Sequence, residues 1–82
     1  MPKYAALHQH LNRRRGRAEM LSFEDIESII GKTLPVSAVK HRSFWANDFQ
    51  NHHSHARSWM HAGYRVAYVD RDQKVVRFER TR

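Results

Sequence analysis

The sequence has no cysteine and no long apolar run, and it is poor in acidic side chains, glycine and proline. Without cysteine the chain can form neither disulfides nor thiolate metal sites, and it suits a reducing compartment. No apolar run approaches the roughly 20 residues that span a bilayer, and the N-terminus carries no signal-like apolar core. We therefore expect a cytoplasmic protein without a membrane partner, nucleoid-associated if it binds DNA.

The chain is also short, with 82 residues. A chain of this length buries only roughly 60–65% of the surface that it exposes when unfolded, which argues against a large internal substrate cavity. Hydrophobic residues at 40% and aromatic residues at 11% still argue against disorder. We expect one small folded domain over residues 1–82.

Basic side chains outnumber acidic ones: 15 Lys and Arg stand against 8 Asp and Glu, a formal net charge of +7. Three of the acids, Glu24, Asp25 and Glu27, stand together, so most other segments are strongly basic. Because Lys and Arg neutralise phosphate groups, this excess of basic side chains favours nucleic acid as the partner. The alternative is a basic surface that only faces solvent.

The N-terminal segment predicts a helix followed by a basic arm. Tyr4, Leu7 and Leu11 repeat at helical spacing, which predicts a helix over residues 3–13. The run NRRRGR at 12–17 follows, and its arginines suit either a solvated loop or an arm that contacts phosphates.

A short strand over 18–21 leads into a second helix with clear end signals. Ser22 is suited to the N-cap, with Asp25 placed for a capping box, and Gly31 is placed to end the helix. The neighbouring acids complement the helix N-terminus, so we interpret them as structural rather than catalytic.

The stretch LPVSAVKHRSFWAN at 34–47 combines apolar, basic and aromatic residues. Pro35 suits the first turn of a helix over 36–42. The spacing predicts that Val36 and Val39 point inward, and that the polar side chains between and after them point outward.

The aromatic residues that follow predict core packing. Residues 43–46 are expected to be extended, because Phe44 and Trp45 favour strands. A further helix is predicted over 52–62. Trp59 is expected in the core and Trp45 in the core or at its edge, the alternative for both being a stack on single-stranded bases.

The C-terminal segment predicts a β-hairpin that turns at 70–73. Alternation places two sets of side chains on opposite faces. The inner set is Tyr64, Val66, Tyr68, Val76 and Phe78, and the outer set includes Arg65 and Arg77.

Together these elements predict an α+β fold in a single domain. Residues 22–41 are typical of a helix-turn-helix, and the hairpin takes the place of a wing, which indicates a winged-helix-like variant. The N-terminal helix and basic arm occupy 1–17, and the α+β core occupies 18–82. The second helix spans only about two turns, and an extra strand and helix precede the hairpin, which departs from an ordinary winged helix.

Four short patterns in order, FxxIExIxGxxLPxSA, WAN, ARxWxxAGYxV and VxFxR, run from residue 23 to residue 80. This combination resembles a family of small bacterial domains of unknown function that occur alone or attached to larger proteins. The resemblance implies a shared α+β fold and supplies no activity. Where many such sequences carry a Trp-Trp pair, this one has Phe44 and Trp45, which keeps the aromatic surface and loses one indole donor.

Seven histidines raise the question of a metal or a catalytic role. Without cysteine, and without the His spacing of a metalloprotease, we predict no metal and no cofactor. A metal-independent ribonuclease toxin is an alternative, since a small basic protein can cut RNA with a histidine base and an arginine for the phosphate. Its candidate residues are His41, Arg42, His53, Arg57 and His61.

We predict a nucleic-acid-binding protein, not an enzyme, that serves as a small double-stranded DNA-binding regulator or accessory factor, with DNA favoured over RNA. The residues expected nearest the groove are Ser37, Lys40, His41 and Arg42; those expected at phosphates are Arg13, Arg14, Arg15, Arg17, Arg57, Arg65 and Arg77. His53 and His61 extend the line of Arg57 along one helix face. Asn47 suits either a contact to adenine or a turn cap.

A second function class remains open. The domain also suits a protein-docking or inhibitor module of a bacterial or phage system, and nothing in the sequence excludes a homodimer. Binding to nucleic acid with a steep salt dependence would separate the first class from the second.

Overall fold

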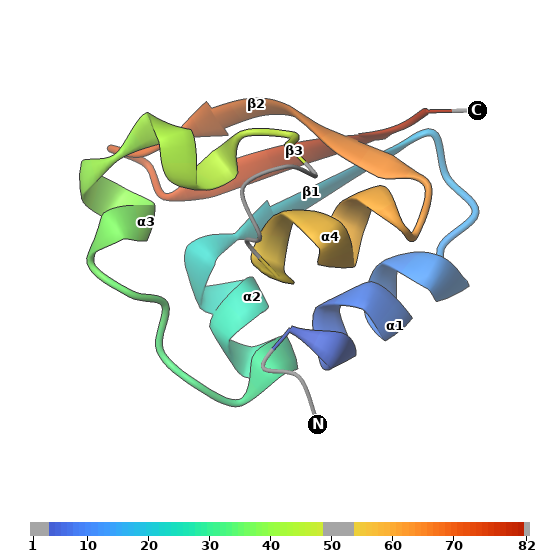
Figure 1. The fold of residues 1–82 in the computed structure, drawn as a ribbon, viewed down its shortest axis with the longest axis horizontal. Helices are drawn as coiled ribbons and strands as arrows, with labels where there is room; N and C mark the ends of the chain where they lie inside the picture. The colour runs from blue at the N-terminus through green and yellow to red at the C-terminus, as the bar shows by residue number, and fades with distance from the viewer. Residues whose placement is uncertain (1–3, 49–53, 82) are drawn as a thin grey trace.

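The computed structural model describes residues 4–48 and 54–81, in which helices cover one side of a three-stranded antiparallel sheet (Figure 1). The elements are α1 (Ala5–Arg13), β1 (Ala18–Ser22), α2 (Phe23–Ile30), α3 (Ser37–Lys40), the 3₁₀ helix η1 (Arg42–Trp45), α4 (Ser54–Met60), β2 (Tyr64–Asp70) and β3 (Val75–Arg80). The strand order is β1-β3-β2, so β3, the second strand of the hairpin, lies in the centre of the sheet, and β1 pairs with the edge of β3 that β2 leaves open. The predicted α+β class is confirmed.

The core is a row of aromatic rings between the helices and the sheet. Phe23 stacks on Trp45 with ring centroids 5.1 Å apart, Trp45 stacks on Trp59 at 5.8 Å, and Trp59 meets Phe78 of the central strand at 5.7 Å. All four side chains are buried, as the sequence predicted for both tryptophans. Burying a side chain of this size contributes about 1.5–3 kcal/mol, so this row is a large part of what a small core can supply.

The ends of α2 follow the sequence signals. The Ser22 hydroxyl accepts a hydrogen bond from the Asp25 backbone N–H at 2.9 Å, and the Asp25 carboxylate accepts one from the Ser22 N–H at 3.0 Å. Gly31 closes the helix with φ of 73°, in the left-handed region that suits glycine. A carboxylate oxygen of Glu27 accepts the Leu34 N–H at 2.7 Å and fixes the following turn.

The segment after α2 differs from the prediction. The helix α3 has four residues, and Val36 and Val39 are 66% and 39% exposed, so the prediction that they point inward is wrong. Ala38 faces the core instead, and its carbonyl accepts the Trp45 indole N–H at 2.9 Å. A single turn is too short to lie along a groove as a recognition helix, so winged-helix similarity is not confirmed.

The extended segment predicted at 43–46 is also wrong, because these residues lie in or next to η1. Phe44 and Trp45 are consecutive, and both are buried. A strand would turn them to opposite faces, whereas a 3₁₀ turn lets both rings enter the core.

A β-bulge changes the face of one predicted inward residue. Val66 pairs with Phe78, but Tyr68 pairs with Arg77, so one extra residue enters β2 between these positions. Tyr68 is therefore 55% exposed and Val69 is buried in its place.

Asn47 ties the loop after η1 to the edge strand β2. Its Oδ1 accepts the Val66 N–H and the Trp59 indole N–H, both at 2.8 Å, and its Nδ2 donates to the Val66 carbonyl at 2.9 Å. The carboxamide thus takes the place of a neighbouring strand along this edge. Both lone pairs of Oδ1 are used, so a bidentate contact to adenine would require these bonds to break.

We predict that Asn47→Ala lowers the free energy of unfolding by about 2–4 kcal/mol, because it leaves the Trp59 indole N–H and both Val66 backbone groups without their partner. Urea denaturation measures the change. Asn12→Ala is the matched control, since Asn12 is exposed on α1, and it should change stability by less than about 0.5 kcal/mol. Equal effects of the two substitutions would contradict the role assigned to Asn47.

Candidate nucleic-acid interface

The segment of residues 13–17, called the arm below, consists of the last residue of α1 and the loop that follows, and this loop is held to the sheet by its own backbone. The Arg80 N–H donates to the Arg17 carbonyl at 2.7 Å, and Nη2 of Arg80 donates to the Arg14 carbonyl at 2.6 Å. The Tyr64 hydroxyl donates to the Gly16 carbonyl at 2.9 Å. Because these carbonyls face the protein, the arm has a defined path without using its side chains.

The arginine side chains of the arm differ in their partners. Arg14 forms an ion pair with Glu19 at 3.3 Å. Arg13, Arg15 and Arg17 are exposed and form no ion pair with any residue in the described ranges 4–48 and 54–81. Three guanidinium groups are therefore available to an anionic partner, on a segment whose backbone lies at one end of the sheet (Figure 1).

Arg80 is the residue that sequence reasoning missed here. It shares the inward parity of Val76 and Phe78 on β3, and its guanidinium lies 5.2 Å from the centre of the Tyr64 ring. A cation on the inner face of a strand needs hydrogen-bond acceptors or an aromatic ring beside it. The inward position of Arg80 in the alternation of β3 was the sequence signal that could have indicated these contacts.

The sheet surface that faces away from the helices adjoins the arm. We call this surface the outer face and define it by Ala18, Met20, Arg65, Tyr68, Arg77 and Glu79. Glu79 joins Arg65 at 3.2 Å and Arg77 at 3.0 Å. A concavity of about 550 Å³, lined by Arg17, Arg80 and the adjacent outer-face residues, connects the two surfaces.

The predicted groove-facing residues lie elsewhere. Lys40, His41 and Arg42 are exposed at the end of α3 and the start of η1, and Ser37 is half-buried at the beginning of α3. Figure 1 shows α3 at the opposite end of the molecule from the arm. The structure therefore separates two basic surfaces that the sequence treated as one site.

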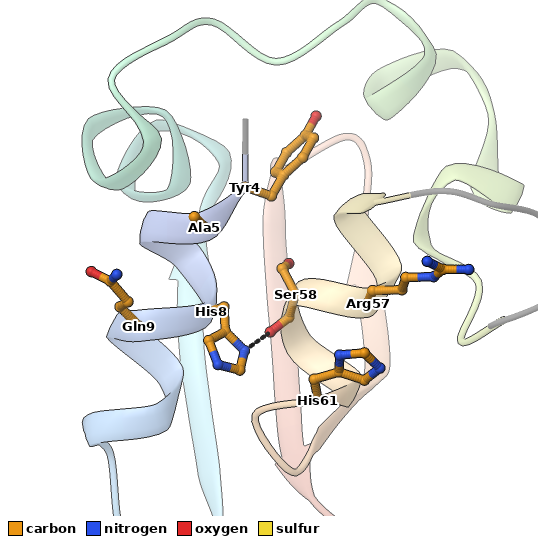
Figure 2. A pocket seen from close by; sticks show the side chains of 7 residues that line it. All are labelled: Tyr4, Ala5, His8, Gln9, Arg57, Ser58 and His61. Carbon is orange, nitrogen blue, oxygen red and sulfur yellow. Dashed lines mark hydrogen bonds between the residues drawn. The ribbon is translucent and has the colours of Figure 1, made fainter. Parts of the chain in front are cut away.

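Two more of the predicted residues border a groove between α1 and α4, of about 390 Å³ (Figure 2). Arg57 and His61 line it together with His8, whose Nδ1 donates to the Ser58 carbonyl at 3.2 Å. The Arg57 guanidinium extends away from His8. His53 lies outside the described residues, and His41 and Arg42 do not line this groove.

The described part of the chain holds no metal site of clustered side chains. No group of three or more His, Asp or Glu side chains there is arranged to hold a metal ion. None of the helices there is long and apolar enough to cross a membrane.

A comparison with protein families adds one finding. The model of a domain of unknown function, DUF7662, matches residues 4–81. The chain belongs to this family. The match includes the arm, the three strands and the groove between α1 and α4, so all of these surfaces lie within the DUF7662 domain. Searches of curated proteins and of solved structures found no match.

One histidine of this DUF7662 domain lies in the last turn of α1, just before the arm. His10 has a buried Nε2 without a hydrogen-bond partner among the described residues. Burial, assisted by the nearby Arg14 guanidinium, lowers the pKa of His10 below its ordinary value of 6.5, and the Glu19 carboxylate only partly opposes this shift.

We predict that Tyr64→Phe loosens the arm while keeping the buried ring, because it removes only the hydroxyl that donates to Gly16. Losing one such bond should raise the initial rate of tryptic cleavage within residues 13–17 by about 2- to 10-fold, measured by mass spectrometry. Tyr68→Phe is the control, since Tyr68 is exposed and its hydroxyl makes a long hydrogen bond, 3.4 Å, to Asp70 on the same strand. Unchanged cleavage in Tyr64→Phe would show that the bond does not hold the arm.

We also predict a pH-dependent contribution from His10. In the unfolded chain its imidazole takes up a proton near the ordinary pKa of 6.5, whereas the folded protein resists protonation to a lower pH. This contribution is therefore present above about pH 6.5 and is lost as the pH falls through the folded pKa. In His10→Gln, the loss of stability between pH 7.5 and pH 5 should be smaller than in the wild type. Urea denaturation at both values measures it, and identical losses would contradict the prediction.

Proposed function

We propose that this DUF7662 domain binds nucleic acid through the arm, with double-stranded DNA as the partner. The observation that carries the proposal is a set of three exposed arginines that form no ion pair within the described residues: Arg13 at the end of α1, and Arg15 and Arg17 on the loop whose backbone is anchored to Arg80 and Tyr64. Arginines held on a fixed path lose less conformational freedom when they meet phosphates than arginines on a free tail. The formal net charge of +7 supplies attraction at long range.

Duplex rather than single-stranded nucleic acid is favoured by where the aromatic residues lie. Proteins that bind single strands stack successive bases on exposed aromatic rings. Trp45 and Trp59 are both buried in the core, and Tyr68 is the one exposed aromatic ring in the described ranges 4–48 and 54–81, so this part of the chain has no series of rings for successive bases. A duplex needs no such rings, because its outward phosphates are what the arm can contact.

The location of the contact differs from the first expectation. The helix α3 has four residues and is too short to lie along a DNA groove. Lys40 and Arg42 therefore form an alternative contact surface, and the arm is the main one. A role as a small regulator or accessory factor fits this binding mode at the level of class only.

The test measures binding of a fluorescent 20-base-pair duplex by anisotropy between 50 and 300 mM salt. The variant Arg13→Gln/Arg15→Gln/Arg17→Gln removes three charges from the arm. If each contacts one phosphate, the slope of log K against log salt should fall by about 2.7, from about 0.9 per phosphate.

A matched variant, Lys32→Gln/Lys40→Gln/Arg42→Gln, removes the same number of charges from exposed positions away from the arm. It should change the salt slope by less than about 1. Equal losses in the two variants would indicate net charge alone, and a larger loss in the matched variant would place the contact at α3. Either result contradicts the proposal, as does the absence of any duplex binding at 50 mM salt.

A further inference from the structure

The middle row of the outer face combines a cation with two exposed neighbours. Arg77 is on the central strand, and the register places Met20 of β1 and Tyr68 of β2 directly opposite it. Met20 and Tyr68 are 57% and 55% exposed, since α1, α2 and α4 lie on the other side of the sheet (Figure 1). An exposed thioether and an exposed phenol around a guanidinium serve no core, so this row is available to a partner.

Within the described residues, the Arg77 guanidinium is held from one side only. Its Nε donates to Oε2 of Glu79 at 3.0 Å, while the other carboxylate oxygen, Oε1, accepts from Arg65 at 3.2 Å. No hydrogen bond from the two terminal nitrogens of Arg77 is found among the described residues. The Glu79 carboxylate therefore restrains the plane of the guanidinium. It leaves the two terminal nitrogens of Arg77 available to donate to another pair of acceptor atoms.

Guanine offers such a pair in the major groove of DNA. Its O6 and N7 both accept hydrogen bonds, and a bidentate contact from arginine is the commonest specific contact to a base. Apolar side chains beside the arginine suit the thymine methyl group, which lies in the same groove.

Two neighbouring strands of the sheet have the width that the groove admits. Adjacent strands lie about 4.8 Å apart, so β3 with one neighbour forms a ribbon of two strands. The major groove of B-DNA is about 12 Å wide and admits a two-stranded β-ribbon. The concavity between Arg17, Arg77 and Arg80 makes the arm continuous with this face, so phosphate contacts and base contacts could be made together.

We propose that the outer face enters the major groove of double-stranded DNA, that Arg77 reads guanine there, and that Glu79 is the positioning residue for Arg77. This inference rests on the proposed function, because it needs the arm to bring a duplex to the sheet. It adds sequence selection to a contact that the arm alone would make to any sequence.

The experiment selects from a pool of 30-base-pair duplexes with 12 random central base pairs, using the wild type and Arg77→Lys. The wild type should enrich a motif that contains guanine. Arg77→Lys keeps the charge and loses the planar fork, so its preference for guanine at that position should fall by about 5- to 100-fold. Its melting temperature should be that of the wild type, so that the lost preference does not come from a lost fold.

Glu79→Gln separates a positioning role from a merely structural one. It removes a negative charge beside the DNA, so affinity for the unselected pool should rise. It also weakens the restraint on Arg77, so discrimination between the selected duplex and one with that guanine replaced should fall by about 3-fold or more. Unchanged or improved discrimination would overturn the role assigned to Glu79.

Three results would overturn the inference as a whole. Binding without enrichment of any motif would refute base reading while leaving the proposed function intact. An enriched motif that Arg77→Lys still selects would exclude Arg77 as the reader. Tighter binding to a single-stranded pool of the same length, lost in Tyr68→Ala, would assign the outer face to unpaired bases. Absence of any duplex binding, by contrast, would refute the proposed function itself.

Discussion

The stack of rings from Phe23 through Trp45 and Trp59 to Phe78 is the contact on which the rest of the structure depends. A short chain has few residues with which to build a core, and here large rings supply much of it from α2, η1, α4 and the central strand. Since the described helices gather around this stack, they cover one side of the sheet (Figure 1). The other side stays open, and that open side carries Arg65 and Arg77.

Hydrogen bonds connect the aromatic core to the sheet edge and to the arm. Asn47 satisfies the edge of β2 and the Trp59 indole together, so the aromatic stack and the sheet edge share one carboxamide. Tyr64 belongs to the core through its buried ring and to the arm through its hydroxyl. The path of the arm is thus a consequence of core packing, which is why basic side chains can project from a loop that is itself well anchored.

Local rules recovered much of the fold. The Ser22–Asp25 capping box, the left-handed Gly31 and the inward Val76 and Phe78 all depend on neighbours in sequence, and each was predictable. The bulge that exposes Tyr68 was not, because it depends on how β2 pairs with β3 after Val66. Strand propensity also misplaced Phe44 and Trp45, since burying two consecutive rings outweighed their preference for extended backbone.

The candidate site was predictable only as a set of residue types. Charge alone indicated both the arm and residues 40–42 as contacts for nucleic acid. The three-dimensional structure shows that these two segments lie at opposite ends of the molecule. The role of Arg80 could not be predicted from charge, because its side chain donates hydrogen bonds to backbone carbonyls that are more than 60 residues away in the chain.

The central claim is that the arm and the outer face form one DNA-binding surface. The most direct measurement is a map of backbone amide and arginine Nε chemical-shift changes in a ¹⁵N-labelled protein titrated with a 14-base-pair duplex. The account predicts that the largest changes lie at residues 13–17 and at Met20, Arg77 and Arg80. Changes centred on residues 37–42 or on the groove between α1 and α4, with the arm unaffected, would contradict it.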